Sequence, residues 1–327
     1  MKRQKETAMR FASIALMLCL VLFSFPACGV RYRTVSRYAM GARFDLSLPA
    51  GEDEDVYTAI LTDAEGLLSP AYATSLVSCL NAGKAVSLEN LPDIAALFRL
   101  GEELREKTGG AFSLFAGEET ALWHFDEAAA LPDADALSQA VADTCRAGLR
   151  LSADGWLLTA GKADLGAAGK GLAVARLAAV LTEKGKSGLI SAGSTTVAVG
   201  TKNGRPWRIG VRDPFSEEGA LLGVLSLTDT ALSTSGSYEK CFTLDGVLYH
   251  HILDARTGMP VDSGLVSVTV IVKDATLADM LSTAAFLMGA EAGMALCRAY
   301  GAEALFVTQE GELILSEGCK QFFTSRT

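Results

Sequence analysis

The stretch Val266-Ser267-Val268-Thr269-Val270-Ile271-Val272 decides the fold. It is rich in valine and isoleucine, whose branched side chains favour extended backbone, and it has no clear polar face. This pattern predicts a strand buried within a sheet. The chain continues directly into a predicted helix from about Thr276 to Tyr300, so the C-terminal part is organised around a buried strand followed by a long helix.

Strand signals dominate the region before this segment. Cys241–Leu244 and Val247–His251 flank Asp245-Gly246, a dipeptide that favours a two-residue hairpin turn because both positions tolerate positive φ. A closing hairpin is expected to turn at Glu310-Gly311, and Phe44, Leu46 and Leu48 alternate with polar residues as in a half-buried strand. Further strands are predicted at Leu189–Ser191, Thr196–Gly200, Trp207–Arg212 and Gly223–Leu227.

Helical periodicity is concentrated earlier in the chain. Helices are predicted over Asp53–Leu68, Leu91–Lys107, Ala134–Arg146 and from a loop at Asp164–Gly171 to about Lys184, with short strands around a turn at Gly155. Helices and strands are grouped rather than strictly alternating. This grouping predicts an α+β fold with mixed, largely antiparallel sheets and flanking helices, in one continuous domain over residues 37–327.

The N-terminus reads as a targeting segment. Four basic residues precede an apolar, charge-free run at Phe11–Phe25, which is short for a membrane span and typical of a signal peptide. The sequence around Cys28 resembles a lipoprotein processing box, so we expect a signal peptide over residues 1–28, lipid on Cys28 and a tether over 29–36; the competing interpretation is one uncleaved membrane anchor. Either way the domain is expected outside the cytoplasmic membrane and attached to it, in the periplasm or on the outer face.

Composition narrows the class of protein further. The 327 residues carry a net charge of −9 without a basic run beyond the extreme N-terminus, which argues against a nucleic-acid partner. The five cysteines after Cys28 are scattered without a Cys-x-x-Cys pair, so buried structural thiols are expected rather than a zinc site.

Two segments could carry chemistry with phosphate and metal. Asp279 and Thr283 are four residues apart on the predicted C-terminal helix and therefore share a face, where both could offer oxygen to a hard cation such as Mg²⁺. The alternative is a helix-terminal Asp that favours the helix dipole and a Thr that fills a gap. The loop Asp164-Leu165-Gly166-Ala167-Ala168-Gly169-Lys170-Gly171 leads into a helix whose N-terminus could attract phosphate, although its spacing is neither a dinucleotide fingerprint nor a P-loop.

His250 and His251 end a predicted hairpin strand, and strand alternation sends them to opposite faces. Only one of the two can therefore point into a site. The turn that follows begins with Asp254, which could position the backbone or a base. A serine hydrolase triad is disfavoured because the Gly-x-Ser-x-Gly motif is absent and Ser235 lacks that context.

Seven segments, taken in order, resemble the FAD:protein FMN transferase family, the ApbE family. They are Tyr38–Gly41, Thr108–Phe112, Leu122–Phe125, Asp164–Gly171, Leu232–Tyr238, His250–Pro260 and Ala278–Thr283.

The resemblance implies roles for individual residues. Asp279 and Thr283 would bind Mg²⁺ through side-chain oxygens and Ala167 through its backbone carbonyl, while His251 would be the general base. The positions implied to contact FAD are Met40, Ala73, Thr74, Ser75, Ser113, Lys170 and Leu253. In the implied reaction the FMN half of FAD passes to a Thr or Ser hydroxyl of an acceptor flavoprotein, a subunit of a respiratory redox complex, and AMP leaves.

The chain departs from the family pattern at several positions. Ser113 stands where an Asp is usual, Ala175 and Ala255 replace an Asp and a Pro, and Gly193-Ser194-Thr195 replaces a Gly-Gly-Asp-like turn. These departures keep two alternatives open: an FAD-binding lipoprotein without transferase activity, and a Mg²⁺-dependent enzyme that hydrolyses FAD to FMN and AMP.

Overall fold

The computed structural model describes residues 29–125, 129–216 and 219–325. Tyr32–Thr327 form one compact unit. The predicted signal peptide and Cys28 lie outside the described residues.

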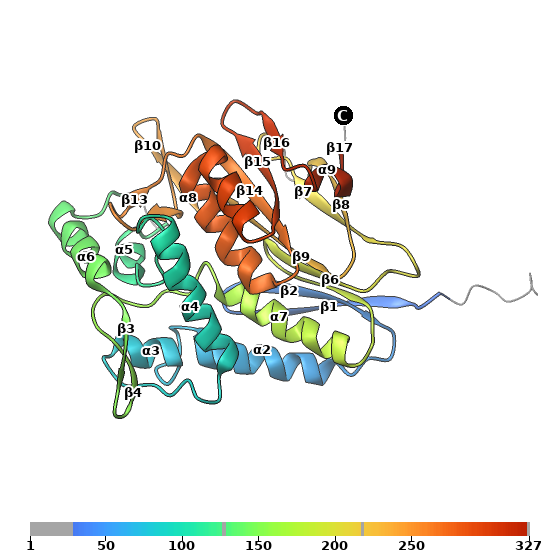
Figure 1. Ribbon diagram of the computed structural model, residues 1–327, viewed down its shortest axis with the longest axis horizontal. Helices are drawn as coiled ribbons and strands as arrows, with labels where there is room; N and C mark the ends of the chain where they lie inside the picture. The colour runs from blue at the N-terminus through green and yellow to red at the C-terminus, as the bar shows by residue number, and fades with distance from the viewer. Residues whose placement is uncertain (1–28, 126–128, 217–218, 326–327) are drawn as a thin grey trace, which may run out of the picture. The chain divides into compact units, whose positions relative to one another are not determined.

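The centre of this unit is an eight-stranded sheet in which every neighbouring pair is antiparallel (Figure 1). Its strands, in spatial order, are β1 (Tyr32–Ala39), β2 (Ala42–Pro49), β5 (Gly188–Ala192), β6 (Thr195–Val199), β9 (Thr230–Gly236), β14 (Leu265–Val272), β15 (Glu303–Thr308) and β16 (Leu313–Leu315). The α+β prediction is thus confirmed, and the main sheet is antiparallel throughout.

The β-branched segment forms the buried strand β14 between β9 and β15. Val268 and Val270 belong to the core on the helical side of the sheet, whereas Ile271 packs into a second core on the other side. A strand covered on both faces needs apolar residues at both phases of the pleat, which explains the run of valine and isoleucine.

Three helices pack on one side of the sheet: α2 (Glu54–Leu68) against β1, α7 (Gly169–Glu183) against β5 and β6, and α8 (Ala275–Ala299) against β9 and β14. Opposite them, β7 (Trp207–Arg212), β8 (Leu221–Leu227) and β17 (Phe323–Ser325) form a small antiparallel sheet. Among the described helices α8 is long and apolar enough to cross a membrane, but most of the apolar stretch that qualifies it is buried in the core.

Most of the remaining elements lie beside this layered body, whereas the short α9 lies next to β17 and β8 (Figure 1). They are α3 (Leu76–Asn81), α4 (Pro92–Lys107), α5 (Gly117–Leu122), α6 (Ala134–Arg146), β3 (Leu149–Ser152), β4 (Gly155–Leu158), β10 (Cys241–Leu244), β11 (Val247–His250), β12 (Leu253–Asp254), β13 (Met259–Pro260) and the short α9 (Cys319–Phe322). Of these elements, α3 and α4 share a hydrophobic core with α8, and α9 packs through Cys319 into the core on the other face of the sheet.

Two predictions need correction. The tether expected over residues 29–36 is shorter, because Tyr32–Ala39 pair in register with β2 as the edge strand β1. The sequence pattern also missed β9, since its Ser and Thr residues look like a polar loop, while in the fold Ser233 and Ser235 face a polar cluster under α8.

Candidate functional site

Asp279 lies in the second turn of α8 and is 4% exposed. Its Oδ1 accepts hydrogen bonds from the hydroxyls of Thr195 and Ser233, both at 3.0 Å. Its Oδ2 accepts one from the backbone N–H of Gly171 at 2.9 Å. A carboxylate offers about four acceptor positions, so this one keeps room for a further electrophile.

Hydroxyl groups continue along the same face of α8. Thr283 Oγ1 lies 3.0 Å from Ser235 Oγ, and Ser235 Oγ lies 2.9 Å from Ser282 Oγ. The spacing of four residues between Asp279 and Thr283 therefore does place both side chains toward β9, as the helical repeat predicts.

The backbone carbonyl of Ala167, a predicted metal ligand, lies just before the start of α7. Gly171 is the third residue of α7, so its N–H is one of the donors at a helix start that have no acceptor within the helix, and it donates to Asp279. The ladder begins one residue later, where the Leu172 N–H donates to the Ala168 carbonyl at 3.0 Å. The carbonyl of Ala167 is thus left out of the ladder of α7.

These donors fit Mg²⁺ better than a transition metal. In the part of the chain that the structure describes, no group of three His, Cys, Asp or Glu side chains could hold a metal. One carboxylate, one hydroxyl and one carbonyl form an all-oxygen set, and Mg²⁺ commonly takes one or two carboxylates and completes its octahedron with water and phosphate oxygens. Asp279, Thr283 and Ala167 are therefore the residues that would hold it.

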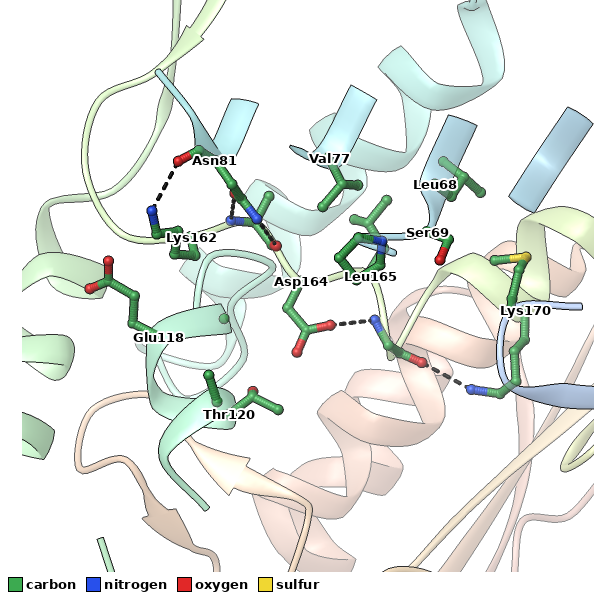
Figure 2. A pocket seen from close by; sticks show the side chains of 16 residues that line it. Leu68, Ser69, Val77, Asn81, Glu118, Thr120, Lys162, Asp164, Leu165 and Lys170 are labelled. Carbon is green, nitrogen blue, oxygen red and sulfur yellow. Dashed lines mark hydrogen bonds between the residues drawn. The ribbon is translucent and has the colours of Figure 1, made fainter. Parts of the chain in front are cut away.

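A cavity of about 550 Å³ lies beside the loop that precedes α7 (Figure 2). Leu68, Pro70, Val77 and Leu165 form an apolar wall. Polar groups come from Asn81, Glu118, Thr120, Lys162, Asp164 and Lys170. This volume and mixture suit a nucleotide-sized ligand.

The predicted flavin contacts lie at different distances from this cavity. Met40 and Lys170 line it. Ser75 is fully buried as the N-cap of α3, and Ala73 and Thr74 are exposed in the loop before it. Ser113 and Leu253 are half-buried and do not line the cavity, so the structure brings only part of the predicted set to it.

The hairpin β10–β11 ends at His250, and the two histidines separate as the alternation predicts. His250 Nε2 lies 3.1 Å from the Val261 carbonyl and its ring packs edge-on against Phe286. His251 Nδ1 is buried and has no hydrogen-bond partner among the described residues. His250 is therefore held in the framework, and His251 keeps a nitrogen available.

Burial first of all, and then the positive charges of Lys170 and Lys240, lower the pKa of His251 to about 4, although a backbone hydrogen bond at Lys240 opposes the shift. A general base works best when its pKa lies near the working pH. The main physical cause of the low pKa is burial, which disfavours the charged imidazolium, and the cations near His251 disfavour it further. Anionic phosphates bound there would raise the pKa of His251 back toward its usual range.

Sequence reasoning missed several residues of the site. Ser233 and Ser235 alternate along β9 and so face α8 together, a signal that the period of two could have revealed. Thr195 was noted only as a departure from the family turn, and Asn81 gave no local signal. The Asn81 side chain is bonded to both the N–H and the carbonyl of Ala163, which fixes the cavity floor across 82 residues of sequence.

Known proteins resemble this chain in sequence and in fold. The sequence profile of the ApbE family matches residues 40–306. A protein of Treponema pallidum named FAD:protein FMN transferase is 34% identical, and the match covers 93% of each chain. A Klebsiella pneumoniae protein of the same name is 32% identical over 68% of this chain and 66% of its own.

Solved structures show the same fold. The ApbE protein of Thermotoga maritima superposes with a TM-score of 0.79 at 27% identity, over 91% of this chain and 100% of the other. The apo flavinyl transferase ApbE of Pseudomonas stutzeri gives 0.76 at 27% identity, over 91% and 99%. Fold and sequence together define a transferase enzyme. The chain belongs to the ApbE family.

Proposed function

We propose that this chain splits FAD and attaches its FMN half to a Thr or Ser hydroxyl of an acceptor protein, with Mg²⁺ bound at Asp279, Thr283 and Ala167. The observation that carries the proposal is the hydrogen bond from Gly171 to Asp279, which brings this carboxylate to the start of α7, where the Ala167 carbonyl precedes the helix in a loop that borders a nucleotide-sized cavity. The names of the relatives, FAD:protein FMN transferase, support the same activity.

The reaction exchanges one phosphorus–oxygen bond for another. The acceptor hydroxyl oxygen bonds to the phosphorus of the FMN half, the anhydride bond to the AMP half breaks, and AMP leaves. His251 takes the hydroxyl proton as the new bond forms. When bound, Mg²⁺ supplies neutralisation of the phosphate charge.

The protein's own residues orient the substrate. Lys170 Nζ, at present 2.9 Å from the Gly166 carbonyl, lies in the cavity wall beside the N-terminus of α7, where a phosphate would find both a cation and the helix dipole. The apolar wall around Leu68 and Val77 would take a ring system of FAD.

A test of transfer uses the protein without residues 1–28, FAD, Mg²⁺ and a candidate acceptor domain, and weighs the acceptor by mass spectrometry. We expect a mass gain of one FMN and release of AMP, both lost with EDTA. FMN and AMP released without acceptor labelling would show hydrolysis instead, and intact FAD with unlabelled acceptor would contradict both.

We further propose that the enzyme works outside the cytoplasmic membrane, held there by lipid on Cys28, and that its acceptor is a flavoprotein subunit of a respiratory redox complex. The basic, then apolar N-terminal segment ending at Cys28 supports this. Cell fractionation of a Cys28→Ser variant tests the anchor. The variant should move from the membrane to the soluble exported fraction, and membrane attachment equal to that of the parent would favour an uncleaved anchor.

A further inference from the structure

Glu119 stands out within α5 because its carboxyl group is fully buried and unpaired. The residue is 0% exposed, and neither carboxyl oxygen has a hydrogen-bond partner among the described residues. Buried carboxylates are normally paired, because an isolated charge in a protein interior is costly. Its sequence neighbours Gly117, Glu118, Thr120 and Ala121 line the cavity, so Glu119 lies behind the cavity wall that they form.

The side chain faces the elements that support α5. Trp123, four residues later and so on the same side of the helix, donates from Nε1 to the Gly258 carbonyl at 2.7 Å. Thr144 of α6 is the hydroxyl next to Glu119, and it donates to the Phe115 carbonyl at 3.1 Å. α5 is thus seated on the turn Asp254–Gly258, which directly follows Leu253 and closely follows His251.

The charged groups around Glu119 are few. On the turn, Asp254 is paired with Arg256. On α4, Arg105 donates to the carbonyls of Thr144, Cys145 and Ala147 at the end of α6. Lys162 lies beside the start of α5, where its carbonyl accepts from the Gly117 N–H, and it donates from Nζ to the Asn81 carbonyl.

The pKa of Glu119 is raised to about 7, chiefly by desolvation and to a smaller extent by the Asp254 carboxylate, while the nearby Thr144 hydroxyl opposes the rise. The uncharged acid is therefore the form that suits this position. If Glu119 ionised in place, a second buried carboxylate would face Asp254 beneath the cavity wall. Water can solvate that charge only if α5 moves away from the Asp254–Gly258 turn.

We propose that Glu119 is a positioning residue: in its uncharged form it seats α5 on the Asp254–Gly258 turn and holds the cavity wall in shape, and its ionisation displaces α5 and weakens flavin nucleotide binding. The inference rests on the proposed function, which makes FAD the ligand of the cavity. It places a titrating group behind the binding wall rather than in contact with substrate.

The first test is the dissociation constant of FAD with Mg²⁺, measured by calorimetry from pH 5.5 to 8.5. If binding requires the protonated acid, the constant for the parent protein is flat below pH 7 and rises by up to about tenfold per pH unit above it. Glu119→Gln, which cannot ionise, should remove that rise. Glu118→Gln, the same change on the same helix, should keep the slope whatever it does to affinity at one pH. A slope equal to the parent's in Glu119→Gln overturns the inference.

The second test needs no ligand. A group whose pKa rises on folding costs stability progressively as pH increases from its unfolded value to its folded value, which for Glu119 is from about 4.5 to about 7. The melting temperature of Glu119→Gln relative to the parent should therefore rise through that window; Glu119→Leu serves if the amide misfolds. Equal pH dependence of melting contradicts the inference even if FAD binds, whereas absence of FAD binding at every pH contradicts the proposed function instead.

Discussion

The carboxylate of Asp279 and the backbone N–H of Gly171, 108 residues apart in sequence, are joined by a buried hydrogen bond of 2.9 Å. This bond fastens the start of α7 to the second turn of α8. It orients one predicted metal ligand, Asp279, at the start of α7, where the carbonyl of another, Ala167, precedes the helix and lies outside its ladder. The bond therefore connects the packing of two core helices to the chemistry of the site.

Gly171→Ala should separate these two helices. A Cβ on Gly171 would lie 2.5 Å from the Ala275 carbonyl oxygen and 2.7 Å from Asp279 Cβ, and the backbone cannot yield as a flexible side chain would. We expect a loss of roughly 1–3 kcal/mol in the free energy of unfolding, measured by urea denaturation, together with loss of Mg²⁺-dependent turnover.

The matched control is Gly66→Ala within α2, where a Cβ would meet nothing within 4 Å. Because alanine is the better helix former, this variant should gain up to about 1 kcal/mol and keep its turnover. Equal stability of the Gly171→Ala variant and the parent would show that the contact between α7 and α8 is looser than described.

Asp279→Ala should remove the metal dependence of the enzyme. It deletes the predicted carboxylate ligand and leaves the Thr195 and Ser233 hydroxyls and the Gly171 N–H without their acceptor. We expect turnover with saturating FAD to fall by at least the roughly 10- to 100-fold that loss of an outer-shell partner costs a metal site. The residual rate should no longer respond to Mg²⁺.

Asp274→Ala is the control for stability, because Asp274 caps the same helix by accepting from the Leu277 N–H at 2.8 Å. It should cost about 1 kcal/mol and preserve the response to Mg²⁺. A normal Mg²⁺ titration of the Asp279→Ala variant would refute the role of Asp279 as a ligand.

Much of the fold could be predicted because local signals and tertiary packing agree. The valine-rich strand β14, the hairpin at Asp245-Gly246 and helix α6 lie where the pattern places them. Strand β9 was not predicted, because hydrophobic periodicity detects apolar faces and Ser233 and Ser235 of β9 face a buried polar cluster instead.

The site was only partly predictable for a related reason. Asp279 and Thr283 share a helix, so spacing alone relates them. The roles of Asn81 and Glu119 depend on residues that are distant in the chain: Asn81 is bonded to Ala163, and the charge of Asp254 acts on Glu119. A sequence pattern cannot report such contacts, nor the burial that shifts the pKa of a carboxyl group.

Ser113→Asp tests whether the departure from the family pattern matters. Ser113 Oγ accepts from the Phe115 N–H at 3.1 Å, and an aspartate can accept the same bond while offering a second oxygen. If this position contacts FAD, as the resemblance implies, the dissociation constant of FAD should fall several-fold in Ser113→Asp and change little in Ser113→Ala. A weaker complex with aspartate would mean that the pocket is adapted to serine.

His251→Gln should slow transfer far more than it weakens FAD binding, because the imidazole is assigned to proton removal rather than to substrate affinity. General-base removal typically costs about 10²- to 10⁴-fold in rate. Single-turnover labelling of the acceptor measures the rate, and calorimetry measures the affinity. His250→Gln is the neighbouring control: loss of its contacts with Val261 and Ile252 should lower stability while the labelling rate stays within a few-fold of the parent's.

His251 should also make the stability of the folded protein depend on pH in the acid range. The pKa of His251 is about 4 in the folded protein and about 6.5 when unfolded, so the unfolded chain binds more protons between these values and stability falls as pH drops through that window. The loss approaches roughly 3 kcal/mol at pH 4, at 1.36 kcal/mol per unit. His251→Gln should therefore resist acid unfolding better than the parent. Identical acid transitions by circular dichroism would place His251 in contact with solvent, and a labelling rate unchanged by the substitution would remove it from the mechanism.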